Sequence, residues 1–102
     1  MVSAKQCETL QELRDEIDRL DAILVPIFLE RVQYIYQSGG RIKSRREEVP
    51  ALDRVERQIV RLRQLAEQHG GSADFIERLY RAIIHEFTEE EHRVFDKRMA
   101  ER

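Results

Sequence analysis

The chain has 102 residues, of which 41% are hydrophobic and 37% charged, with a formal net charge of −2. This composition excludes a disordered chain and predicts a single soluble, helix-rich domain over residues 1–102. Because the basic residues alternate with acids, and because no apolar run reaches the ~18 residues of a membrane helix, we expect neither a nucleic-acid nor a membrane partner. A lone cysteine, Cys7, and an N-terminus without a signal-peptide core predict a reducing, cytoplasmic location.

An apolar spacing of three and then four residues predicts one long helix over residues 9–44. Thr9 is its expected N-cap with Glu12 completing a capping box, and Pro26 should bend the helix locally without ending it. A helix of about 35 residues is roughly 50 Å long and overhangs whatever the rest of the chain can cover, which predicts a two-fold dimer. Its apolar seam consists of Leu10, Leu13, Ile17, Leu20, Leu24, Ile27 and Tyr34.

A mobile loop over 44–49 and two further helices, 51–68 and 73–99, are predicted next, with Gly70-Gly71 and the N-cap Ser72 between the helices. No strand pattern appears, so the expected fold is all-α with three helices in each subunit. The inward face of the second helix is predicted to hold Leu52, Val55, Ile59, Leu62 and Ala66. The third is predicted to turn inward Ile76, Tyr80, Ile83, Ile84, Phe87, Val94 and Phe95.

Two charged residues, Arg31 and Glu91, stand where helical phase predicts burial. They either pair with each other and fix the register of the helices, or line a buried site. Lys43 and Arg54 lie nearby in the pattern, whereas Arg14 lies on another face and is free to serve a partner subunit's site. Several cations with one carboxylate, no nucleophile paired to a histidine and no metal-ligand cluster predict an anionic small molecule that is held by position and electrostatics, without covalent catalysis.

The three histidines, His69, His85 and His92, match no metal-ligand spacing and are expected at the surface or at edges.

The charged motifs, taken in order, resemble the all-helical class of chorismate mutases. The resemblance is carried by LRDEIDRLD at 13–21, Glu30-Arg31, GRIK at 40–43, Pro50 with Asp53-Arg54-Val55, and Ile83-Ile84 followed by Glu91. It implies an intertwined homodimer of three-helix subunits with sites shared between subunits. It also implies a cofactor-free [3,3] rearrangement of chorismate to prephenate.

The resemblance implies a role for each matching residue. Arg31 and the Arg14 of the other subunit would clamp the two substrate carboxylates, and Arg54 would assist them. Lys43 and Glu91 would address the ether oxygen as the C–O bond breaks. Asp53, Val55 and Phe87 complete the expected substrate-binding set.

Two residues depart from the family pattern. Glu91 stands where the family commonly has glutamine, so it must be protonated to donate a hydrogen bond, which predicts that activity rises as pH falls. Val55 stands where the mutases commonly hold the ring hydroxyl with a glutamate. This second departure resembles isochorismate pyruvate lyases and 4-amino-4-deoxychorismate mutases.

A third departure is the spacing of 12 residues from Arg31 to Lys43, one more than is usual in the family. In a regular helix the extra residue rotates Lys43 by about a third of a turn. Either Gly39-Gly40 absorbs it as a bulge, or Ile42 replaces Lys43 in the site. The preferred function is chorismate mutase, followed by isochorismate pyruvate lyase and aminodeoxychorismate mutase. A helical dimerisation module is the non-enzymatic alternative.

Overall fold

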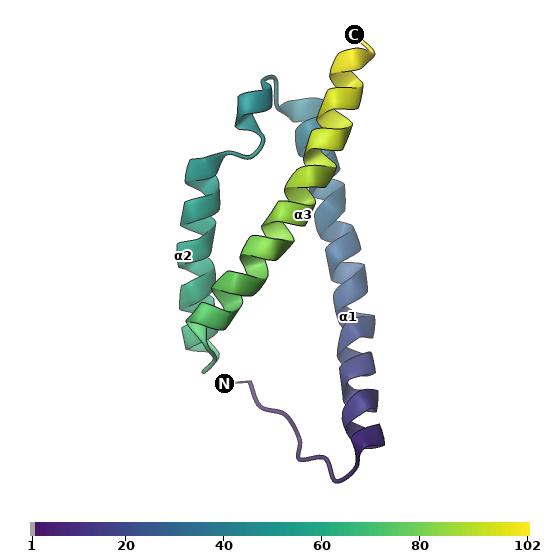
Figure 1. Ribbon diagram of the computed structural model, residues 1–102, viewed down its shortest axis with the longest axis vertical. Helices are drawn as coiled ribbons and strands as arrows, with labels where there is room; N and C mark the ends of the chain where they lie inside the picture. Colours follow the sequence, from purple (N-terminus) through teal and green to yellow (C-terminus); the bar gives the residue numbers. More distant parts are fainter. Residues whose placement is uncertain (1) are drawn as a thin grey trace.

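The computed structural model describes residues 2–102, and these form helices and no strands. The long helices are α1 (Leu10–Gln37), α2 (Leu52–Gln68) and α3 (Ala73–Ala100), as Figure 1 shows. Between α1 and α2 lie a π turn, η1 (Ser38–Ile42), and a short 3-10 helix, η2 (Arg46–Glu48). The predicted all-helical fold with three long helices is therefore confirmed, but α1 ends as a regular helix before the glycine pair.

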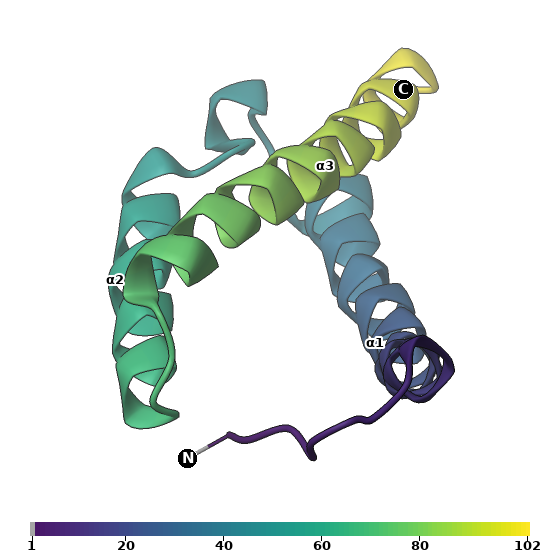
Figure 2. The same cartoon turned by 60° about the horizontal axis from the view of Figure 1, so that its bottom comes forward.

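The chain is elongated, with extents of 58 × 27 × 15 Å. Its radius of gyration is 17.2 Å, whereas a compact chain of this length would have about 13 Å. In Figure 1, α2 and α3 form a hairpin, and α3 runs diagonally from the far end of α2 to the C-terminal end of α1. The N-terminal half of α1 diverges from this hairpin (Figure 2).

The buried core is small and comes mainly from the α2–α3 hairpin. It holds Ile59, Leu62 and Ala66 of α2, Phe95 of α3, and Val49 from the segment before α2. Leu52, predicted to point inward, is instead 70% exposed because it is the first residue of α2, and it is Val49 of the preceding segment that is buried. The segment 44–49, predicted as a mobile loop, is thus partly built into the core.

The helix ends follow the predicted chemistry with one change. The Thr9 hydroxyl accepts a hydrogen bond from the Glu12 amide at 3.1 Å, and the Ser72 hydroxyl accepts one from the Phe75 amide at 3.1 Å. The Glu12 carboxylate accepts its bond from the Glu8 amide at 2.8 Å, one residue before the position that a capping box requires. Pro26 lies inside α1, which continues through it as predicted.

The apolar seam of α1 has little cover within one chain. No residue of α1 is buried, and Ile17, Leu20 and Ile27 are each about half exposed. The N-terminal segment runs from the start of α1 toward the α2–α3 turn (Figure 2), where the Val2 amide donates to the His69 carbonyl at 3.0 Å. Within the described residues, none of the helices is both long enough and apolar enough to cross a lipid bilayer.

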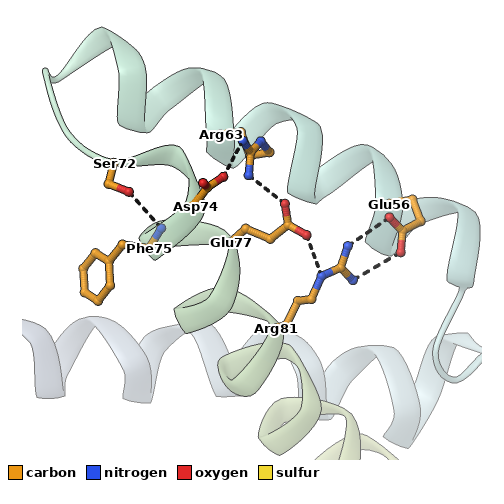
Figure 3. A network of polar contacts seen from close by, with 7 residues as sticks. All are labelled: Glu56, Arg63, Ser72, Asp74, Phe75, Glu77 and Arg81. Atoms are coloured by element: carbon orange, nitrogen blue, oxygen red, sulfur yellow. Dashed lines mark hydrogen bonds and ion pairs between the residues drawn. The ribbon is translucent and has the colours of Figure 1, made fainter.

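An ion-pair network joins α2 to α3 on the outer face of the hairpin (Figure 3). Arg63 of α2 contacts Asp74 and Glu77 of α3, each at 2.8 Å. Arg81 of α3 contacts Glu77 at 2.9 Å and reaches back to Glu56 of α2 at 3.2 Å. Hydrogen bonds from Arg81 and then from Arg63 hold the pKa of the Glu77 carboxyl below its usual value. The network links the two helices that form one side of the site, and because its members are largely exposed it adds only modestly to stability.

Candidate active site

A cavity of about 310 Å³ lies where all three helices and the segment between α1 and α2 meet. Its size suits a small metabolite. Six residues of the predicted site line it: Arg31, Lys43, Arg54, Val55, Phe87 and Glu91. Their charges sum to three cations minus one carboxylate, which leaves +2, so the cavity favours a ligand with two negative charges.

Glu91 lines the cavity and is paired with Lys43. Its Oε2 atom lies 3.2 Å from the Lys43 Nζ, and the residue is only 5% exposed. The same oxygen has no hydrogen-bond partner, so Lys43 and Glu91 attract each other by charge alone. The Oε2 atom can therefore still accept a hydrogen bond. Glu91 therefore pairs with Lys43. The pair of Glu91 with Arg31, which the sequence left open as a device that fixes the register of the helices, does not form among the described residues.

The π turn brings Lys43 into this position. The Lys43 amide donates to the Ser38 carbonyl at 2.8 Å, a bond that spans five residues instead of four. The turn absorbs the extra residue between Arg31 and Lys43. Lys43 consequently lines the cavity, whereas Ile42 is 65% exposed. Of the two alternatives that the sequence left open, the bulge is the one that forms.

Gly39 permits the close approach of this turn to α3. A Cβ atom at Gly39 would lie 2.7 Å from both the Cγ and the carbonyl oxygen of Glu91, and 3.2 Å from Cγ2 of Val94. A Cβ at Gly40 would meet no heavy atom within 4 Å. The two glycines thus differ in function: Gly39 is required by packing against Glu91, whereas the space beside Gly40 is open.

Arg31 is held against an aromatic ring and keeps an unused donor. Its guanidinium carbon lies 4.3 Å from the centre of the Phe87 ring, and its buried NH1 atom has no hydrogen-bond partner. Burial lowers the pKa of Arg31, an effect that Tyr80 opposes and the charge of Arg54 reinforces. Because a buried, unpaired guanidinium donor is costly, this arrangement favours an anionic ligand at NH1.

Two predicted site residues do not line the cavity. Asp53 is exposed in the first turn of α2, because helical rotation points it away when Arg54 and Val55 face the cavity. The substrate contact predicted for Asp53 therefore stays a prediction, since Asp53 is absent from the lining of this cavity. Arg14 is exposed in the N-terminal half of α1, away from the cavity of its own chain.

Sequence reasoning did not identify the neutral polar residues of the cavity, Ser38, Gln58 and Thr88. The only available signal was helical phase, which places Gln58 four residues after Arg54 and Thr88 three residues before Glu91. Among the histidines, the Nε2 of His92 lies 2.6 Å from the Val49 carbonyl oxygen. Residues 2–102 contain no group of three or more side chains arranged to hold a metal ion.

Comparison with known proteins agrees with this geometry. A family model described as chorismate mutase type II matches residues 13–92. The chain therefore belongs to the chorismate mutase type II family, and it is an enzyme of that family. A curated relative from Pseudomonas aeruginosa, named isochorismate pyruvate lyase, is 31% identical over 91 residues, which cover 89% of each chain.

Proposed function

We propose that this enzyme carries out cofactor-free pericyclic chemistry on a chorismate-type dicarboxylate, and that its substrate is isochorismate, which loses pyruvate. The observation that carries the proposal is the buried, unpaired NH1 of Arg31 in a cavity that also holds Lys43 and Arg54. Two guanidinium groups match two carboxylates, since each forms paired hydrogen bonds with an anionic fork.

In this proposal the chain supplies position and charge, and the substrate supplies the reacting bonds. The ether C–O bond breaks while a ring hydrogen moves to the methylene carbon of the enolpyruvyl group, which gives pyruvate and an aromatic ring. Negative charge develops on the ether oxygen, where the Lys43 ammonium would stabilise it. A pre-aimed donor at such an oxygen lowers the barrier by roughly 3 to 4 kcal/mol.

Isochorismate is preferred because of Val55 and the relative. Val55 lines the cavity and offers no hydrogen bond to a ring hydroxyl at the position where mutases commonly use a glutamate. The relative that aligns over 89% of the chain is named for the lyase reaction. The rearrangement of chorismate to prephenate is the second candidate, favoured by the description of the matching family. Both reactions break the same type of ether bond and would use the same cations.

We also propose that two chains form a dimer and that Arg14 of each completes the cavity of the other. The apolar seam of α1 is exposed along its length, and such a seam is typical of a helix that packs along a partner. Arg14 lies in the same half of α1, away from its own cavity. Sedimentation would test this directly, because a single species with the mass of one chain would exclude the dimer.

The test is to incubate the purified chain separately with isochorismate, chorismate and 4-amino-4-deoxychorismate and to identify the products by chromatography. We expect pyruvate from isochorismate, with kcat/KM lowered at least about tenfold in Arg31→Ala, because one charge-assisted hydrogen-bond pair is lost. Arg57→Ala removes an exposed arginine from α2 outside the cavity and serves as the matched control. Prephenate as the main product would instead select the mutase reaction, and no turnover of any substrate would refute the proposal.

A further inference from the structure

The segment between η1 and α2, residues 43–51, is here called the connector, and three side chains of α3 hold it. The Nε2 of His92 lies 2.6 Å from the Val49 carbonyl oxygen. Arg46 donates to the Asp96 carboxylate at 3.1 Å, and the Arg98 guanidinium donates to the Lys43 carbonyl oxygen. In Figure 1 the connector runs from the end of α1 to the start of α2, beside the C-terminal half of α3.

The first residue of the connector, Lys43, is held through both its backbone amide and its backbone carbonyl. The Lys43 amide donates to the Ser38 carbonyl in the π turn at 2.8 Å, and the Lys43 carbonyl accepts from Arg98 of α3. Glu91, the ion-pair partner of the Lys43 side chain, belongs to the same helix as Arg98. Two residues of α3 therefore contact Lys43, Arg98 at the backbone carbonyl of Lys43 and Glu91 at its side chain.

At its other end, the connector enters the core and then forms a wall of the cavity. Val49 is 4% exposed, and its carbonyl oxygen faces His92. The next two residues, Pro50 and Ala51, line the cavity. His92 directly follows Glu91, so one turn of α3 supplies a carboxylate to the cavity and a hydrogen bond to its wall.

The three contacts are not equally strong. Arg46 and Asp96 are both more than half exposed, and such surface pairs contribute little to stability. The contacts made by His92 and Arg98 are partly buried and end on backbone carbonyl oxygens, which would otherwise lack partners. These two contacts are therefore the ones that can hold the connector in place.

We propose that His92 and Arg98 are positioning residues, which hold the connector on α3 so that Lys43 and the Pro50 wall face the substrate. The consequence for turnover rests on the proposed function, whereas the state of the connector can be measured without any substrate. The two tests can therefore fail separately.

The first test measures amide hydrogen exchange by NMR in the full chain. The Val49 amide donates to the Arg46 carbonyl at 2.9 Å, so its exchange reports opening of the connector. We expect it to quicken about fivefold in His92→Leu and in Arg98→Met, because each removes one hydrogen bond. His92→Gln and Arg98→Lys keep a donor and should stay close to the wild type. The amide of Ile59 in the core of α2 distinguishes local opening from general destabilisation, since only the latter would quicken both.

The second test measures turnover in the same variants. We expect kcat to fall about tenfold in both disrupting variants. In Arg98→Met the displaced Lys43 no longer meets the developing charge, and in His92→Leu the released Val49 lets the adjoining Pro50 wall shift away from the reacting groups. KM should change less than about twofold, since Arg31 and Arg54 remain in place. Lys97→Ala, an exposed neighbour on α3, is the control and should change neither parameter.

The outcomes separate the two proposals. Unchanged Val49 exchange in both disrupting variants would overturn the positioning role, as would faster exchange with an unaltered kcat in an active enzyme. If the wild type turns over none of the substrates, the proposed function fails. The exchange data alone then decide whether α3 holds the connector.

Discussion

Replacing Gly39 with alanine should displace the centre of the site. The added Cβ would lie 2.7 Å from the Glu91 carbonyl oxygen, which belongs to the α3 backbone and cannot rotate away. Overpacking of this kind costs about 1 to 3 kcal/mol, whereas alanine gains only about 1 kcal/mol over glycine in a helix. We expect a net loss of up to about 2 kcal/mol and a fall of about 100-fold in kcat/KM if Glu91 and Lys43 separate by about 1 Å. Thermal unfolding and steady-state kinetics measure both effects.

Gly40→Ala is the matched control for this substitution. The same group is added one residue further along the same π turn, at a place with no heavy atom within 4 Å. The unfolding temperature should rise by a few degrees, as about 0.5 to 1 kcal/mol gives in a chain of this size, and activity should be retained. A Gly39→Ala variant that is as stable and as active as the Gly40→Ala variant would show that the turn does not pack on Glu91 as described.

Three further predictions follow from single side chains. Arg31→Lys should be nearly as impaired as Arg31→Ala, because an ammonium group cannot replace the paired donors of a guanidinium. Equal activity of Arg31→Lys and the wild type in steady-state assays would refute this. Glu91→Gln should keep most of the activity, because an amide at this position can still donate a hydrogen bond to the ether oxygen. An inactive Glu91→Gln in steady-state assays would mean that the carboxylate is needed to hold Lys43. Folding lowers the pKa of Glu77, so its ionised carboxylate contributes fully to stability above about pH 4.5, and this contribution disappears as the pH falls below that value. Acid should therefore lower the unfolding temperature of the wild type more than that of Glu77→Gln.

Helical phase in the sequence was enough to single out two charged residues that line the cavity. Arg31 and Glu91 interrupt apolar faces, and each proved to line the cavity because a charged residue at a buried position has to meet a partner or a ligand. Phase also placed the core of α2 at Ile59, Leu62 and Ala66. Such reasoning succeeds where one periodic helix face determines burial.

The contacts of the connector could not be predicted from helical phase, because they join residues that are distant in sequence. His92 meets Val49 across 43 residues, and Arg98 meets Lys43 across 55. Neither contact leaves a periodic signal, so a segment rich in charge was predicted to be a mobile loop. The choice between a bulge and a regular helix at Gly39-Gly40 stayed open for the same reason, since packing against α3 decides it.

The position of Lys43 therefore depends more on α3 than on the helix that leads to it. An extra residue in a regular helix would rotate Lys43 out of the cavity by about 100°. Instead, Gly39 packs against Glu91, the Lys43 carbonyl is bound by Arg98, and the π turn takes up the added residue between these contacts. A π turn has poorer geometry than an α turn, so it persists only where tertiary contacts favour it. Here those contacts are the ones that place an ammonium group 3.2 Å from the buried carboxylate, which explains how the site tolerates a change in length in the preceding helix.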